Sequence, residues 1–234
     1  ACHVHGGQTR KETTIPYNHS GLVGEVLSTA LRVSLRDLNA RFLACLRRMP
    51  EEELSYLGFA PTAARLLRAC EAEAMRVMAG CPYALFDAAF RQHECWQVIC
   101  SAAGAARRDA VAAPCGSAEY LAEYDALTEM ALFFAWHLAT TNALATRLVL
   151  GMSSATAELI RSSTLPAIAG AVRTRRRLLR PRWPQRTLFW GRLLAINPQS
   201  SHEEATAAQL LGIQLMATEE RLEELAAAPG ARIR

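Results

Sequence analysis

Residues 150–168 read LGMSSATAELIRSSTLPAI, and this stretch predicts two helices joined by a tight turn. Gly151 follows an apolar run, so we expect it to end a helix in a left-handed or closely packed turn. The first predicted helix covers 154–161, and a two-serine turn follows it. The second covers 164–177 and begins with a capping threonine and a proline in its first turn. Together they form a helix–turn–helix-like element.

The same kind of pattern extends outward in both directions. Apolar side chains recur at every third or fourth position, which is the spacing of an amphipathic helix. The chain has 51% hydrophobic and 21% charged residues, with only 13 glycines and 10 prolines, so an all-α globular fold is expected. Outside the opening stretch, helices are predicted at Leu22–Met49, Tyr120–Leu138, Asn142–Leu150 and Glu203–Ala228.

Two segments without this periodicity divide the 234 residues. The first is polar and contains Gly6, Gly7 and Pro16, and the second, near 101–118, is rich in small residues, glycine and proline. We therefore expect a flexible tail at 1–20, a first helical unit at 21–115 and a second helical unit at 116–234.

The two predicted units resemble each other. A shift of 93 positions places Leu57-Gly58-Phe59 on Leu150-Gly151-Met152, and the order of helices, turn and aromatic residue is the same in both units. The shift also pairs Leu66 with Leu159, Arg68 with Arg161, and Phe90 with Trp183. A duplicated helical unit is expected to pack as a pseudo-dimer, as two identical subunits do about a twofold axis. Two unrelated helical stretches in an Ala- and Leu-rich chain remain the alternative.

The strongest local charge signal is the arginine segment, Arg173–Arg192, which has eight arginines and no acidic residue. The whole chain has a net charge of only +4, and Trp183, Phe189 and Trp190 lie between these arginines. Arginine and aromatic residues together suit phosphate pairing and stacking. The predicted DNA-phosphate contacts are Arg173, Arg175, Arg176, Arg177, Arg180 and Arg182. A solvated basic face, a dock for an acidic protein and a membrane-surface contact are the alternatives.

The last predicted helix has the opposite charge. Its acidic residues are Glu203, Glu204, Glu219, Glu220, Glu223 and Glu224. They could fold back on the arginine segment, meet another basic surface or form a solvated acidic face.

Catalytic and metal-binding signals are weak. No Gly-x-Ser-x-Gly, phosphate-binding loop, Gly-x-Gly-x-x-Gly or His-Glu-x-x-His motif occurs, so we do not expect an enzyme or a cofactor. The seven cysteines form no Cys-x-x-Cys pair and are expected to be reduced core residues. The alternative is a zinc site drawn from Cys81, His93, Cys95, Cys100 and Cys115, although the usual ligand spacing is absent.

Three further expectations concern single residues and location. Leu159 and Ile160 should lie in the core, and His137, within an apolar helix, should be a satisfied core or interface histidine. No apolar run reaches the roughly 18 residues that a membrane span needs, and no signal peptide is visible. A cytoplasmic location is therefore expected.

The second unit resembles FlhD, the subunit that partners FlhC in the flagellar transcriptional activator. The likeness rests on Leu150-Gly151-Met152-Ser153, on Ala157, Leu159 and Ile160, and on Thr164-Leu165-Pro166 with Ile168. These residues match the family series R-L-G-I-S, A-x-L-L and T-L-P in order. The closing helix Ala207–Ala217 is also similar. The first unit matches at Leu38–Leu43, Leu57-Gly58-Phe59 and Ala64–Leu67, but Glu71–Glu73 replaces T-L-P.

The resemblance implies a helical transcriptional regulator that acts on DNA with a protein partner, such as an FlhC-like regulator. FlhD proteins are usually one unit of about half this length that dimerises, so this chain would hold two such units in tandem and could itself form a homo-oligomer. FlhC has a four-cysteine zinc site, and this sequence has no counterpart to it. The alternative function is a cytosolic helical adaptor of a flagellar or type III secretion apparatus, without DNA binding.

Overall fold

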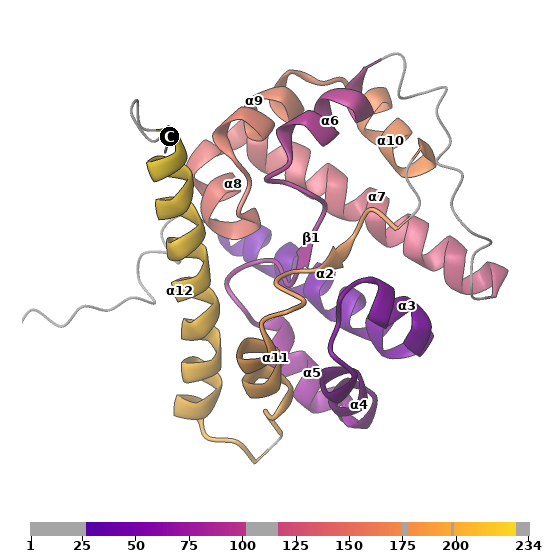
Figure 1. Ribbon diagram of the computed structural model, residues 1–234, viewed down its shortest axis with the longest axis vertical. Helices are drawn as coiled ribbons and strands as arrows, with labels where there is room; N and C mark the ends of the chain where they lie inside the picture. The colour runs from indigo at the N-terminus through magenta and orange to yellow at the C-terminus, as the bar shows by residue number, and fades with distance from the viewer. Residues whose placement is uncertain (1–26, 102–116, 175–176, 198, 228–234) are drawn as a thin grey trace, which may run out of the picture.

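The structure is a computed structural model that describes residues 27–101, 117–174, 177–197 and 199–227. These residues form eleven helices and one two-stranded sheet, which confirms the all-α fold class (Figure 1). The elements are α2 (Thr29–Arg48), α3 (Glu51–Tyr56), α4 (Pro61–Ala69), α5 (Ala72–Ala79), β1 (Phe86–Asp87), α6 (His93–Cys100), α7 (Ala118–Thr141), α8 (Ala143–Leu150), α9 (Ser154–Ser162), α10 (Leu165–Thr174), β2 (Arg180–Pro181), α11 (Thr187–Leu194) and α12 (His202–Ala227). The predicted tail at 1–20 and most of the predicted linker lie outside the described residues.

Helix boundaries follow local chemistry. The Ser28 hydroxyl accepts a hydrogen bond from the Leu31 N–H and starts α2, and Pro50 separates α2 from α3. Ser117 and Ser153 cap α7 and α9 in the same way. The long helix predicted from Leu22 is therefore described only from Thr29 onward.

Both units carry corresponding elements in the same order. Gly58 and Gly151 have φ angles of +79° and +64°, so both glycine turns are left-handed as predicted. Farther along the chain, Trp96 and Trp190 each donate an indole hydrogen bond to the carbonyl eight residues earlier, at 3.1 and 3.0 Å. These tryptophans are 94 positions apart, so the shift is no longer 93 in this part of the units.

The predicted pairing of Phe90 with Trp183 is consequently wrong. Trp183 has a φ of +51° and corresponds to Ala89, whose φ is +57°. The reason is one additional residue in the second unit between its left-handed glycine and this turn.

The two units cross at the short sheet. β1 and β2 are antiparallel, with Phe86 opposite Pro181 and Asp87 opposite Arg180. The helix that follows each strand packs on the other unit (Figure 1). After β1, α6 of the first unit packs against α9 and α10 of the second, and after β2, α11 of the second unit packs against α4 of the first. Cys70 Sγ lies 3.7 Å from the Leu194 carbonyl oxygen, and Ser163 Oγ lies 3.4 Å from Cys100 Sγ.

A continuous core runs through the crossing. The long helices α2 and α7 pack on each other, and Phe42 of α2 meets Phe86 of β1 edge to face at 5.7 Å. Asn39 is fully buried, and its amide donates to the Ala79 and Tyr83 carbonyls while its oxygen accepts from the Leu85 N–H. This side chain satisfies the backbone of the segment that leads into the crossing.

The core predictions have mixed outcomes. Ile160 is buried, and Leu159 is partly buried against the core. His137 is exposed on α7, because the apolar face of that helix lies on other positions. The core half of its prediction is therefore wrong, and a role at an interface stays a prediction. Among the described helices, none is long and apolar enough to cross a membrane.

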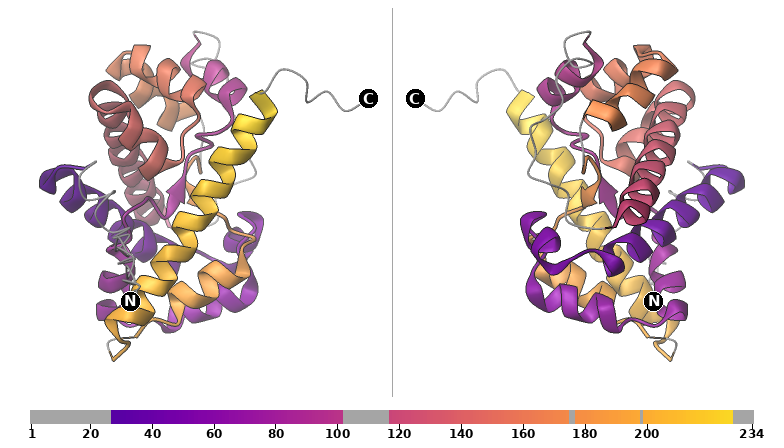
Figure 2. Two further views of the ribbon diagram at one scale, coloured as in Figure 1. Left: turned by 90° about the vertical axis from the view of Figure 1, so that its left-hand side faces the viewer. Right: turned by 90° about the vertical axis from the view of Figure 1, so that its right-hand side faces the viewer.

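Helix α12 lies across both units. In the left-hand view of Figure 2 it runs diagonally over the face where the units cross, from α11 at one end to α8 at the other. Its position brings the acidic half of the helix to the arginine segment.

Candidate functional site

A cavity of about 550 Å³ opens where the units cross, and we call it the crossover cavity. Both units contribute to its wall, because the turns after α3 and α8 and the segments that flank β1 and β2 all reach it. Four arginines line it, namely Arg91, Arg177, Arg180 and Arg182. Three of them belong to the arginine segment.

The backbone around the crossover cavity is strained. All five positive-φ residues of the described chain line it, namely Gly58, Ala89, Gly151, Arg177 and Trp183. A non-glycine residue in this conformation costs about 1–2 kcal/mol. Strained residues gather at ligand and active sites, so this concentration marks the cavity as a candidate functional site.

Arg182 is buried behind α12. Its side chain is 4% exposed, with Nη1 donating to the Val149 carbonyl at 3.2 Å and Nη2 lying 3.5 Å from Glu219 Oε2. The guanidinium also lies over the Trp183 ring, 4.4 Å from its centroid. Burial lowers the pKa of Arg182, and the Glu219 carboxylate opposes this effect. The structure thus places the Arg182 guanidinium beneath α12 instead of on a free surface, where a DNA phosphate would be bound.

Arg177 is also used inside the protein. Its Nη2 lies 2.6 Å from Glu53 Oε1, and the two side chains are 16% and 5% exposed. Glu53 belongs to the first unit, so this ion pair joins the units. The structure thus places the Arg177 guanidinium in an internal contact instead of on a free surface.

Arg180 is different, because it is exposed and has no ion pair among the described residues. Arg186 and Arg192, later in the segment, are exposed as well. The side chain of Arg173, and all of Arg175 and Arg176, lie outside the described residues. Of the six predicted contacts, Arg180 alone is shown with its side chain at the surface.

Acidic residues of α12 pair with residues in and beside the cavity wall. Glu219 accepts a hydrogen bond from Trp183 Nε1 at 2.8 Å, Glu220 pairs with Arg147, and Glu223 Oε2 lies 2.7 Å from Arg91 Nη2. The Glu219 carbonyl accepts a second bond from Arg91 at 2.9 Å. Of the three interpretations of the acidic helix, folding back on the arginine segment is therefore observed at Glu219, which contacts Arg182 and Trp183.

Sequence reasoning missed the contact that seats α12. The Tyr83 hydroxyl donates to the Gln209 carbonyl at 3.0 Å, and its ring lies where a side chain at Gly212 would be. Burial raises the pKa of Tyr83. A single glycine inside an otherwise strong helix was the available signal, because such a glycine marks a close approach of a neighbour.

The predicted helix–turn–helix corresponds to α9 and α10, with Ser163 and Thr164 between them. The Ser163 carbonyl accepts a hydrogen bond from Trp136 Nε1 at 3.1 Å, which fixes the turn on α7. α10 packs on α6 and α7, while Leu165 at its start is 45% exposed.

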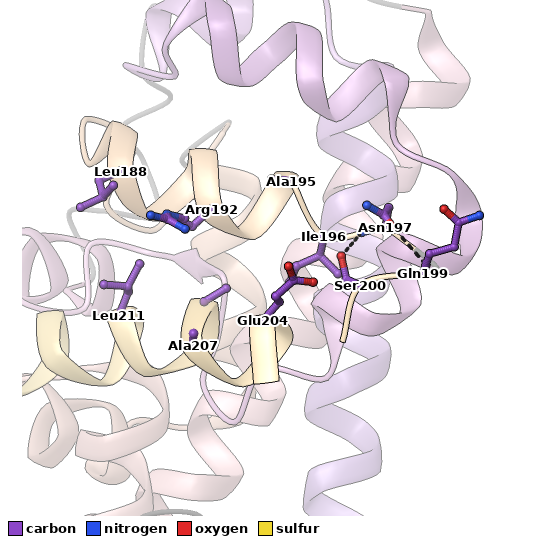
Figure 3. Close-up of a pocket in the computed structure, with 11 residues that line it drawn as sticks. Leu188, Arg192, Ala195, Ile196, Asn197, Gln199, Ser200, Glu204, Ala207 and Leu211 are labelled. Atoms are coloured by element: carbon purple, nitrogen blue, oxygen red, sulfur yellow. Dashed lines mark hydrogen bonds between the residues drawn. The ribbon is translucent and has the colours of Figure 1, made fainter. Parts of the chain in front are cut away.

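A second, more open cavity of about 650 Å³ lies between α11 and α12 (Figure 3). Leu188 and Arg192 of α11 face Ala207 and Leu211 of α12 across it. Glu204 at its edge accepts from the Ser201 N–H at 2.9 Å, so its carboxylate serves the start of α12.

The described residues contain no group of three His, Cys, Asp or Glu side chains placed to hold a metal ion. Cys81, one of the suggested zinc ligands, is buried, and burial raises its pKa to about 12. Cys115 lies outside the described residues.

Comparisons with known proteins add no relative. No protein-family model, no curated protein and no solved structure matches the chain.

Proposed function

We propose that this protein is a transcriptional regulator of the FlhD type, which acts on DNA in a complex with a protein partner. The sequence resemblance supports this proposal, and so do the left-handed turns at Gly58 and Gly151, where the resembling motifs fall in both units. The observation that carries the DNA contact is Arg180, which follows the α9–α10 element, is exposed and has no ion pair with any described residue.

A helical adaptor without DNA binding is the second candidate. It is favoured by Arg177 and Arg182, whose charges are used within the protein, because this leaves fewer arginines for phosphate. In that case the remaining basic surface would hold an acidic protein partner, such as a component of a secretion apparatus.

Salt-dependent binding to a random 30-base-pair duplex separates the two candidates. The test variant changes Arg173, Arg175 and Arg176 to Ala, which keeps every arginine of the crossover cavity. The matched control changes three exposed arginines of the first unit to Ala, namely Arg36, Arg47 and Arg65. Both variants lose three positive charges. A difference between their DNA affinities is therefore due to where the arginines lie and not to the net charge.

The regulator predicts a steep salt dependence that becomes shallower in the test variant. Three lost phosphate contacts reduce the slope of log K against log salt by about 2–3. The control variant should keep the original slope to within about 1. No binding at low salt, or an equal loss in both variants, would favour the adaptor.

A further inference from the structure

We propose that the crossover cavity binds the phosphate group of a small molecule, and that Arg180 supplies the charge that holds it. Arg180 is also the exposed arginine named above for the contact with DNA, so this proposal concerns a second, small-molecule ligand for the same side chain. A cavity of about 550 Å³ is large enough for such a ligand, since small-molecule sites span roughly 300–1,000 Å³.

The charges in the cavity leave one arginine for a ligand. Arg91, Arg177 and Arg182 each have a carboxylate partner, at 2.7, 2.6 and 3.5 Å respectively. Arg180 lines the same cavity and has no such partner in the part of the chain that the structure describes. Its planar guanidinium can bind two oxygens of one phosphate at once.

Asp87 is the acidic residue that faces Arg180 across the ladder. Its carboxylate is turned into its own loop, where it accepts hydrogen bonds from the backbone N–H groups of Ala89 and Phe90, both at 3.1 Å. Burial raises the pKa of Asp87. The Asp87 carboxylate is therefore used by the first turn and forms no ion pair with Arg180 in the described residues.

The corresponding turn of the second unit lacks this carboxylate. Pro181 occupies the position that matches Asp87, and the Trp183 N–H, which matches that of Ala89, donates no hydrogen bond among the described residues. Both Ala89 and Trp183 line the cavity. An external anionic oxygen can thus do at the second turn what Asp87 does at the first.

Two further features favour phosphate as the group bound. A phosphate presents several oxygens, so it can accept from Arg180 and from a backbone N–H together. Gln92 and Gln185, both exposed, line the cavity and bring amide donors to its rim. The strained turns hold these donors in place before the ligand arrives.

The test is a calorimetric titration of the full chain with inorganic pyrophosphate. We expect a dissociation constant of about 1 mM or lower for the unchanged protein. Arg180→Gln should weaken binding at least about tenfold, since a charge-assisted hydrogen bond contributes roughly a tenfold effect or more. The control is Arg186→Gln, which removes an exposed arginine of the same segment outside the cavity and should leave binding unchanged.

Arg180→Lys provides a second variant that keeps the charge and loses the paired donors, and it should bind with intermediate strength. The proposal is overturned if the unchanged protein releases no heat, if Arg180→Gln binds as well as it does, or if Arg186→Gln weakens binding equally. The DNA experiment leaves Arg180 in place, so failure of one proposal is distinguishable from failure of the other.

Discussion

Gly58 and Gly151 share one backbone conformation but face different neighbours. An added Cβ at Gly58 would lie 3.6 Å from Pro184 Cγ, which is ordinary contact, whereas at Gly151 it would overlap the guanidinium of Arg182. Both positions need a left-handed residue, and only one also needs an empty space. The two glycines can therefore separate backbone strain from packing.

Changing each glycine to Ala tests this difference. Gly58→Ala should lower the free energy of unfolding by about 1–2 kcal/mol through strain alone. Gly151→Ala should lower it by about 2 kcal/mol more, because it also displaces a buried arginine from its partners. Denaturant unfolding measures both values. Equal losses would show that Arg182 can move aside without cost.

For single residues, the sequence predicted the backbone conformation better than it predicted the burial and the partners of a side chain. The apolar run and the glycine at its end were enough for the turn at Gly151, because helix termination is local. The burial of Arg182 was not predictable, since it depends on Glu219, which is 37 positions away. Arg180 and Arg182 look alike in the sequence, and only the crossing of the units makes one exposed and the other buried.

For helix α12 as well, the sequence predicted the local structure but not the tertiary partners. Its range could be predicted almost to the residue, from Glu203–Ala228 to the observed His202–Ala227, because helix periodicity is a property of the segment. Its acidic residues left three interpretations open. The partners that decide between them, Arg91, Arg147 and Arg182, come from both units and could not be identified from spacing.

Two helical glycines test how α12 is seated. Gly212→Ala should lower the free energy of unfolding by about 1–3 kcal/mol and speed hydrogen exchange in α12, because the new methyl group overlaps the Tyr83 ring. Gly191→Ala in α11 is the control, with nothing within 4 Å of its Cβ. That change should stabilise the protein by about 0.5–1 kcal/mol. A stabilising Gly212→Ala would contradict the contact with Tyr83.

For the whole molecule, buried acids with raised pKa values predict sensitivity to alkali. Burial raises the pKa of Cys45, Cys70, Cys81, Tyr83, Tyr120 and Tyr124. Above about pH 9 the unfolded chain releases these protons while the folded chain keeps them, so stability falls as the pH rises. For Cys81 this window extends from its ordinary 9.0 to about 12.

Unfolding free energies measured between about pH 8 and 11 check this prediction. Each proton that only the folded state retains lowers stability by about 1.4 kcal/mol per pH unit. Cys81→Ala removes one such group, so its curve should be shallower by about that amount near pH 10–11. Parallel curves for the two proteins would contradict a buried, protonated Cys81.

The exchange of helices between the units predicts that the two halves hold together without a covalent link. A protease site placed between Cys100 and Ala118 would separate α6 from α7 in the chain. After cleavage the pieces should still elute together in native buffer, because α6 packs on α9 and α10 while α11 packs on α4. They should separate in denaturant. Separation in native buffer would show that these contacts are too weak to join the units.

The same exchange has a consequence for synthesis on the ribosome. Cys70, at the end of α4, contacts the Leu194 carbonyl 124 positions later. At about 5–20 residues per second, α4 waits roughly 6–25 s for α11 to be translated. During that time the emerging first unit exposes the surface that α11 will cover, and it is then an expected client for chaperones that bind nascent chains.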